Sequence, residues 1–183
     1  MDKLFMGYLS CRAWVFSQCF TPVNYCSNDW EVLMATDKQI LGNLGEQLVA
    51  RKLDCPGCKN SGKSLRTLPI NFKCADVICD FCGYLAQIKT KTVTDIEKLP
   101  KQILGAAWGP QKERMEAGIY FPLFVVLVEA SGRKKSVWYL PRDLQTKEMF
   151  SPRKPLSSTA RRAGWQGYNI NLDSALSLPT RVL

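Results

Sequence analysis

Apolar residues recur at helical spacing in one segment of the chain, residues 37–53. Residues three and four positions apart share one face of an α-helix, so this spacing predicts an amphipathic helix. Asp37 stands at the expected N-cap position, where a short carboxylate accepts hydrogen bonds from the first unpaired N–H groups. Glu46 lies off the centre of the apolar face, which comprises Ile40, Leu41, Leu44, Leu48 and Val49.

Two later segments, residues 72–78 and 84–89, alternate between apolar and polar positions, as half-buried strands do. A tight turn bounded by Cys79 and Cys82 separates them, which predicts a β-hairpin. Side chains two residues apart on a strand project from the same face. Gln87 and Lys89 should therefore share one face of the second strand, close to Asp76 on the first.

The second half of the chain predicts further strands around one helical segment. The apolar run 119–130 is typical of a buried strand, and residues 136–140 should pair back onto it after a turn at 131–134. Residues 96–118 predict a helix that Pro100 and the Gly109-Pro110 pair would kink or break. This order of elements predicts an α/β fold with a mixed sheet flanked by helices.

Length, composition and charge narrow the class of protein. A chain of 183 residues that is 46% hydrophobic can bury one ordinary core, and no apolar run is long enough to span a bilayer. The short apolar patch at residues 13–16 makes a poor signal peptide, so we expect a soluble, cytoplasmic protein. Residues 1–38 read as an N-terminal extension. The formal net charge of +9 favours a polyanionic partner such as nucleic acid, although solvated lysines alone would give the same value.

Eight cysteines in a chain without an export signal favour metal binding over disulfides. The spacing of Cys55, Cys58, Cys79 and Cys82, two C-x-x-C pairs about twenty residues apart, is that of a zinc ribbon. Four thiolates suit tetrahedral Zn²⁺ and leave no open position, so this zinc would be structural. The alternative is four unrelated buried cysteines. We interpret Cys74 as a buried thiol, and the spacing of Cys11, Cys19 and Cys26 matches no metal signature. The chain contains no histidine, which excludes a Ser-His triad and a Cys/His zinc finger.

Asp76, Gln87 and Lys89 bring a carboxylate, an amide oxygen and an ammonium group to one point of the predicted hairpin. Hydrolysis of a phosphodiester uses Mg²⁺ to polarise the phosphate and to acidify a water molecule. Asp76, the Gln87 amide oxygen and the Ile88 carbonyl offer hard oxygen ligands for magnesium, and Lys89 can stabilise the transition state. A neutral amide should bind metal more weakly than a glutamate, and Glu46 is a candidate second carboxylate. The pattern also arises by chance in proteins without such a site.

A basic segment follows the predicted strands, with aromatic residues among the cations. Such side chains suit phosphate contacts combined with stacking at bases. A basic surface loop is the alternative interpretation. The candidate DNA-binding residues are Arg153, Lys154, Arg161, Arg162 and Trp165.

This segment resembles the DpnI-type (Dam-replacing) restriction endonucleases in its R-K-P-L at 153–156, its T-A-R-R-A-G-W at 159–165, and Gly167, Asn169 and Ile170. The two C-x-x-C pairs and the pair Ala75-Asp76 are also similar to that family, and the resemblance covers residues 41–172. It implies a PD-(D/E)xK nuclease domain at 39–183 with a zinc insert at 54–83, which cuts double-stranded DNA at GATC sites carrying N6-methyladenine with Mg²⁺.

By position, the resemblance implies that Asp76 is a metal ligand and that Lys89 is the catalytic lysine. Gln87 stands where the family has Glu, and Glu46 occupies the place of an acidic residue on the first helix. We therefore expect a methyl-directed, Mg²⁺-dependent endonuclease with a structural zinc. Two alternatives stay open. One is an inactive DNA-binding module of the same fold, because Gln87 replaces a carboxylate. The other is a zinc-ribbon interaction protein without a role on DNA.

Overall fold

The computed structural model describes residues 36–58, 62–69, 72, 74–105, 110–155, 157–159, 167–173 and 179–183. The predicted N-terminal extension lies outside these residues as far as residue 35, together with Cys11, Cys19 and Cys26. Among the helices of the described part, none is both long and apolar enough to cross a membrane.

The predicted N-terminal helix is present as α2 (Asp37–Lys52). Its N-cap is Thr36 and not Asp37, because Thr36 and Gln39 form a capping box. The Thr36 hydroxyl accepts from the Gln39 N–H, and the Gln39 Oε1 accepts from the Thr36 N–H at 2.8 Å. Asp37 instead occupies the first turn, where a negative charge interacts favourably with the helix dipole.

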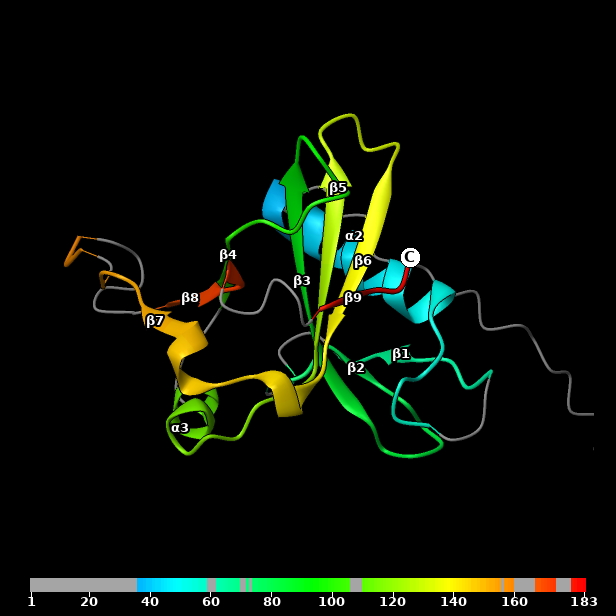
Figure 1. The fold of residues 1–183 in the computed structure, drawn as a ribbon, viewed down its shortest axis with the longest axis horizontal. Coiled ribbons are helices and arrows are strands. Elements are labelled where there is room, and N and C mark those ends of the chain that lie inside the picture. The colour runs from blue at the N-terminus through cyan, green and yellow to red at the C-terminus, as the bar shows by residue number, and fades with distance from the viewer. Residues whose placement is uncertain are drawn as a thin grey trace, which may run out of the picture. The chain divides into compact units, whose positions relative to one another are not determined.

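A six-stranded sheet in the order β1-β2-β3-β5-β6-β9 forms the centre of the fold (Figure 1). The pair β3–β5 is parallel and every other neighbouring pair is antiparallel, so the predicted mixed sheet is confirmed. The strands are β1 (Arg66–Thr67), β2 (Val77–Ile78), β3 (Leu85–Val93), β5 (Leu123–Glu129), β6 (Lys135–Leu140) and β9 (Thr180–Arg181).

The predicted hairpin exists, but its first strand is much shorter than residues 72–78. The two residues of β2 pair with Leu85 and Ala86, at the beginning of β3. Cys74 has φ of 73°, in the left-handed region, so the chain before Asp76 leaves the extended path that pairing requires. Among the residues that the structure describes, no strand therefore lies beside β3 from Gln87 onward on the β2 side.

Two layers of apolar side chains cover the faces of this sheet. On one face, Val49 of α2 packs with Ala86, Ile88, Phe124 and Val126. On the other face, a second layer contains Leu123, Val125, Leu127 and Leu140 with residues from outside the sheet. The strand β5 is buried on both sides, as its uninterrupted apolar run predicts.

The second face is covered by a small antiparallel sheet, β4-β8-β7, where a helix was expected. Its strands are β4 (Gln102–Gly105), β7 (Phe150–Pro152) and β8 (Tyr168–Asn171), and two short 3-10 helices, η1 (Arg142–Leu144) and η2 (Lys147–Met149), precede β7. Ile103 of β4 pairs with Ile170 of β8 and both are buried in the second layer.

The prediction of a helix over residues 96–118 is wrong for residues 96–105 and 117–118 and confirmed for α3 (Pro110–Glu116), while residues 106–109 lie outside the described part of the chain. Residues 102–105 form β4 because they pair with β8. This partner lies more than sixty residues further along the chain, so no local pattern indicates it. Ile96, Leu99 and Ile103 still bury their side chains in the second apolar layer. Their spacing of three and four residues resembles a helix but arises from a turn followed by a strand.

Candidate functional site

Asp76 and Lys89 meet at the open edge of β3. The Lys89 Nζ lies 3.7 Å from the Asp76 Oδ2, and the two side chains keep only 22% and 28% of their surface exposed. Asp76 directly precedes β2, and Lys89 is the fifth residue of β3. Partial burial weakens solvent screening, so this ion pair is stronger than one on an open surface.

The Asp76 carboxylate also holds the backbone of β3. Its Oδ2 accepts a hydrogen bond from the Ile88 N–H at 2.6 Å, at a position where β2 no longer pairs with β3. Charge-assisted bonds of this length are among the stronger protein hydrogen bonds. The Asp76 N–H in turn donates to the Ala86 carbonyl at 2.9 Å, so both the backbone and the side chain of Asp76 are tied to β3.

Glu46 of α2 lies close enough to this pair to interact with both charges. Burial raises the pKa of Glu46, the nearby Asp76 carboxylate raises it further, and Lys89 lowers it in part. The helix thus adds a second carboxylate to the hairpin residues, although Glu46 and Asp76 are thirty residues apart in sequence. A lysine beside two carboxylates, one of which, Glu46, has a raised pKa, is an arrangement typical of functional sites.

Gln87 is half-buried and its amide group makes one specific contact. The Gln87 Nε2 donates to the backbone carbonyl of Cys74 at 2.9 Å. Cys74 is the residue with a left-handed backbone conformation, and its sulfur accepts a hydrogen bond from Arg114 Nη1 at 3.1 Å. Cys74 is half-buried and takes part in this polar network, so its interpretation as a buried thiol is wrong.

Three of the four predicted zinc ligands lie together. The sulfur atoms of Cys55, Cys79 and Cys82 are within 4.8 Å of one another, and those of Cys55 and Cys82 are 3.6 Å apart. Zn–S bonds of about 2.3 Å in a tetrahedral shell put neighbouring sulfurs about 3.8 Å apart, so the cluster has the spacing of a metal site. Cys58 follows on the same loop, and its N–H donates to the Cys55 carbonyl at 3.2 Å. Its sulfur is not part of the three-sulfur group, and its role as the fourth ligand stays a prediction.

The second C-x-x-C turn has a backbone suited to thiolates. N–H groups of Cys82 and Phe81 point to the Cys79 sulfur and lower the pKa of this thiol. Burial and, to a smaller extent, the hydrogen bond with the neighbouring sulfur of Cys82 raise the pKa of Cys55 to about 12. A bound Zn²⁺ would displace the thiol protons and stabilise the thiolates. The residues present therefore fit a metal such as zinc.

The cysteine cluster is joined firmly to the hairpin that carries Asp76 and Gln87. A Cβ atom at Gly57 would lie 2.3 Å from the ring of Tyr84, so the first cysteine loop packs directly onto the beginning of β3. The hydroxyl groups of Tyr84 and Tyr139 of β6 share a hydrogen bond, with 2.7 Å between their oxygens. Arg66 of β1 forms an ion pair with Asp80 of the second cysteine turn at 3.0 Å.

The predicted DNA-binding residues belong to the connection between β7 and β8. The Arg153 N–H donates to the Gly167 carbonyl at 2.8 Å, which closes the base of this loop. Arg153 and Lys154 are exposed. Arg161, Arg162 and Trp165 lie outside the described residues.

A family model described as DpnI, Dam-replacing family, matches residues 29–181, most of the chain. The chain belongs to this family. The resemblance drawn from the cysteine pairs and the basic segment is therefore confirmed. Membership in the Dam-replacing family points to a restriction-type nuclease that binds DNA. The α/β architecture and the sulfur cluster agree with it.

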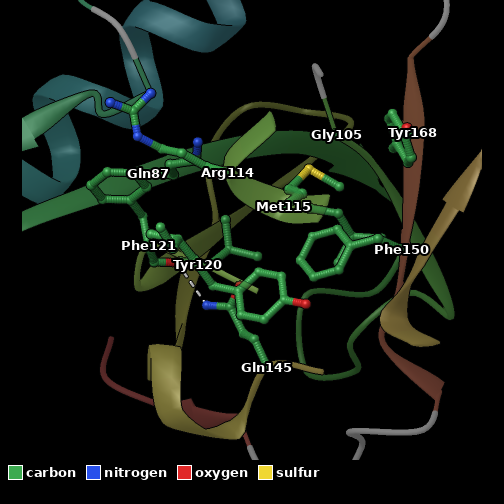
Figure 2. Close-up of a pocket in the computed structure, with 12 residues that line it drawn as sticks. Gln87, Gly105, Arg114, Met115, Tyr120, Phe121, Gln145, Phe150 and Tyr168 are labelled. Carbon is green, nitrogen blue, oxygen red and sulfur yellow. Dashed lines mark hydrogen bonds between the residues drawn. The ribbon is translucent and has the colours of Figure 1, made fainter. Parts of the chain in front are cut away.

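Sequence reasoning did not identify Arg114 or the carbonyl of Cys74. Both depend on a left-handed residue and on a contact between segments forty residues apart, for which the sequence pattern gives no signal. Gln87 and Arg114 also line a small cavity between the two sheets, together with Met115, Tyr120 and Phe150 (Figure 2). Its volume of about 20 Å³ suffices for one water molecule and excludes a nucleobase.

Proposed function

We propose that the chain is a Mg²⁺-dependent endonuclease that hydrolyses double-stranded DNA, with adenine-methylated, GATC-like sites as its target. The observation that carries the proposal is the contact of 3.7 Å between Asp76 and Lys89, with Glu46 beside both, at an edge of β3 that no strand of the described part of the chain covers. Membership in the Dam-replacing family supports the same chemistry.

Hard oxygen atoms gather at this open edge and suit magnesium. Asp76 offers a carboxylate and Gln87 an amide oxygen. The N–H and C=O groups of one strand residue point to the same side, so the Ile88 carbonyl faces the edge at which its N–H meets Asp76. Glu46 supplies the second carboxylate that Gln87 lacks. Magnesium bound there would polarise the phosphate and acidify a water molecule.

Lys89 has two roles in this proposal. Its ammonium group orients the attacking water and donates hydrogen bonds to a non-bridging phosphate oxygen as negative charge accumulates on it. Its ion pair with Asp76 keeps the ammonium group at the site before DNA binds. Water adds to phosphorus and releases a proton to solvent, while the bond to the leaving oxygen breaks and that oxygen takes up a proton, with no covalent intermediate on the protein.

In this proposal, the cysteine cluster supports the active site and the basic segment binds the DNA. A structural zinc at the cysteine cluster would fix the hairpin that carries Asp76. The basic loop between β7 and β8 would contact phosphates, with Arg153 and Lys154 as its described cations, and Arg161, Arg162 and Trp165 complete the proposed surface.

An inactive DNA-binding module is the second candidate function, and Gln87 is the observation that favours it. Its side chain carries no charge and its Nε2 is engaged with Cys74, so one metal-binding carboxylate of the usual site is missing. A zinc-ribbon interaction protein is the third possibility. Incubation of methylated and unmethylated duplexes of one sequence with Mg²⁺, with and without EDTA, separates the three. EDTA-sensitive cutting of the methylated duplex supports the nuclease, and binding without cutting supports the DNA-binding module. Absence of both cutting and binding supports the interaction protein.

A further inference from the structure

The amide of Gln87 faces a backbone carbonyl, and this contact distinguishes glutamine from glutamate. An amide has a donor nitrogen and an acceptor oxygen, whereas an ionised carboxylate has only acceptors. The Nε2 of Gln87 donates to the Cys74 carbonyl at 2.9 Å. A glutamate in the same rotamer would bring a carboxylate oxygen to that distance from the carbonyl oxygen, and the two would repel each other.

The carbonyl cannot easily turn away, because Cys74 is held from several sides. Its φ of 73° is rare for a residue with a side chain and persists only where the surroundings enforce it. Two residues later, the backbone of Asp76 bonds to Ala86 on one side and to Leu68 on the other, each at 2.9 Å. From α3, Arg114 Nη1 donates to the Cys74 sulfur at 3.1 Å.

We infer that the backbone carbonyl of Cys74 is a positioning group that specifies an amide at position 87. It accepts the Nε2 of Gln87 and so leaves the Oε1 as the side-chain atom that can bind a cation. The magnesium part of this inference rests on the proposed function, whereas the hydrogen bond does not. Glutamine at this position is then a requirement of the neighbouring backbone and not a degraded glutamate.

Charge alone gives the opposite expectation for a glutamate at position 87. A second carboxylate at position 87 should tighten metal binding if only charge mattered. Next to the Cys74 carbonyl, the carboxylate must rotate away and take its oxygen from the metal position. We therefore expect Gln87→Glu to raise the half-saturating Mg²⁺ concentration of cleavage by roughly tenfold, a typical effect for groups that orient metal ligands.

The test crosses Gln87→Glu with two substitutions of Cys74 in the full chain. Cys74→Gly accepts a positive φ and keeps the carbonyl in place, whereas Cys74→Val disfavours this conformation. We expect Gln87→Glu to weaken Ca²⁺ binding, measured by calorimetry without turnover, in wild-type and Cys74→Gly backgrounds. In the Cys74→Val background it should cause no further loss. Tighter Ca²⁺ binding by Gln87→Glu in the wild-type background would overturn the inference.

A second readout needs neither metal nor cleavage. The hydrogen bond should shift one side-chain Nε2 proton of Gln87 downfield and slow its exchange, and the signal is assigned by its loss in Gln87→Glu. Cys74→Gly should retain this signature and Cys74→Val should lose it, with zinc content and the backbone amide spectrum as controls of folding. An absent signature in the folded wild type overturns the inference. A present signature without any metal-dependent cleavage overturns the proposed function instead.

Discussion

Gly45 of α2 packs directly against Thr90 of β3, so closely that a Cβ atom at Gly45 would lie 1.9 Å from the Thr90 Oγ1. This close approach sets the distance between the helix and the strand. Glu46 follows Gly45, and Lys89 precedes Thr90. The absence of a side chain at position 45 therefore brings Glu46 near Lys89 and Asp76.

Gly45→Ala should separate the helix from the strand and impair the site. The methyl group cannot fit without a shift, and overpacking of this kind costs about 1–3 kcal/mol of unfolding free energy. We also expect slower cleavage with normal zinc content, measured by plasmid nicking and metal analysis. Gly42→Ala is the matched control, because nothing lies within 4 Å of its Cβ position and alanine favours the helix. Equal effects of both substitutions would contradict this account of α2.

Glu46→Gln should stabilise the metal-free protein at neutral pH while it slows cleavage. Burial and the Asp76 carboxylate raise the pKa of Glu46 in the folded state, so its favourable contribution is complete below the unfolded pKa of about 4.3 and is lost as the pH rises through the folded pKa. The midpoint of thermal unfolding in Mg²⁺-free buffer should therefore be higher for Glu46→Gln near pH 7, and the difference should vanish toward pH 4. A Glu46→Gln variant that is less stable than the wild type at neutral pH would show that the charged form of Glu46 does not destabilise the folded protein.

Substitution of a cluster cysteine should remove the metal and loosen the hairpin. We expect about one zinc per chain by elemental analysis, lost in Cys79→Ser and Cys82→Ser because three thiolates alone do not close the tetrahedron. Cys58→Ser tests the predicted fourth ligand in the same way. Cys74→Ser should keep its zinc, since Cys74 is not part of the sulfur cluster. Full zinc retention in the Cys79 and Cys82 variants would contradict the assignment.

The basic loop should contribute to DNA binding through phosphates. Arg153→Ala and Lys154→Ala should each weaken binding of methylated and unmethylated duplex alike, and each should reduce the slope of log affinity against log salt by about 0.9. Fluorescence anisotropy over a salt series measures both quantities. Lys134→Ala, an exposed lysine in the turn between β5 and β6, should leave the slope unchanged. An unchanged slope in both loop variants would place the DNA elsewhere.

Local rules predicted from the sequence that Asp76 and Lys89 lie close together. The two-residue period of a strand puts Gln87 and Lys89 on one face, and the hairpin turn brings Asp76 close to them. The ion pair between Asp76 and Lys89 agrees with this prediction. The position of Glu46 beside the apolar face of its helix also sufficed to nominate it. These predictions depend on spacing within one or two elements, which the sequence encodes directly.

Relationships between distant segments could not be predicted in the same way. Ile96, Leu99 and Ile103 have helical spacing, yet β4 forms because β8 offers a partner far along the chain. The role of the Cys74 carbonyl depends on a left-handed residue that is not glycine, which no turn rule anticipates. Both features arise from tertiary contacts that override local propensity.

The most direct measurement of the central claim is the cleavage rate of Lys89→Ala on methylated duplex at saturating Mg²⁺, beside Lys91→Ala on the same strand. We expect Lys89→Ala to lose roughly 10²–10³-fold in rate while it still binds DNA, because it removes one charge-stabilising donor. Lys91, which is exposed and donates to the Gln102 carbonyl, should be dispensable. Cleavage by Lys89→Ala at the wild-type rate, or no Mg²⁺-dependent cleavage by the wild type, would contradict an active site built on Asp76 and Lys89.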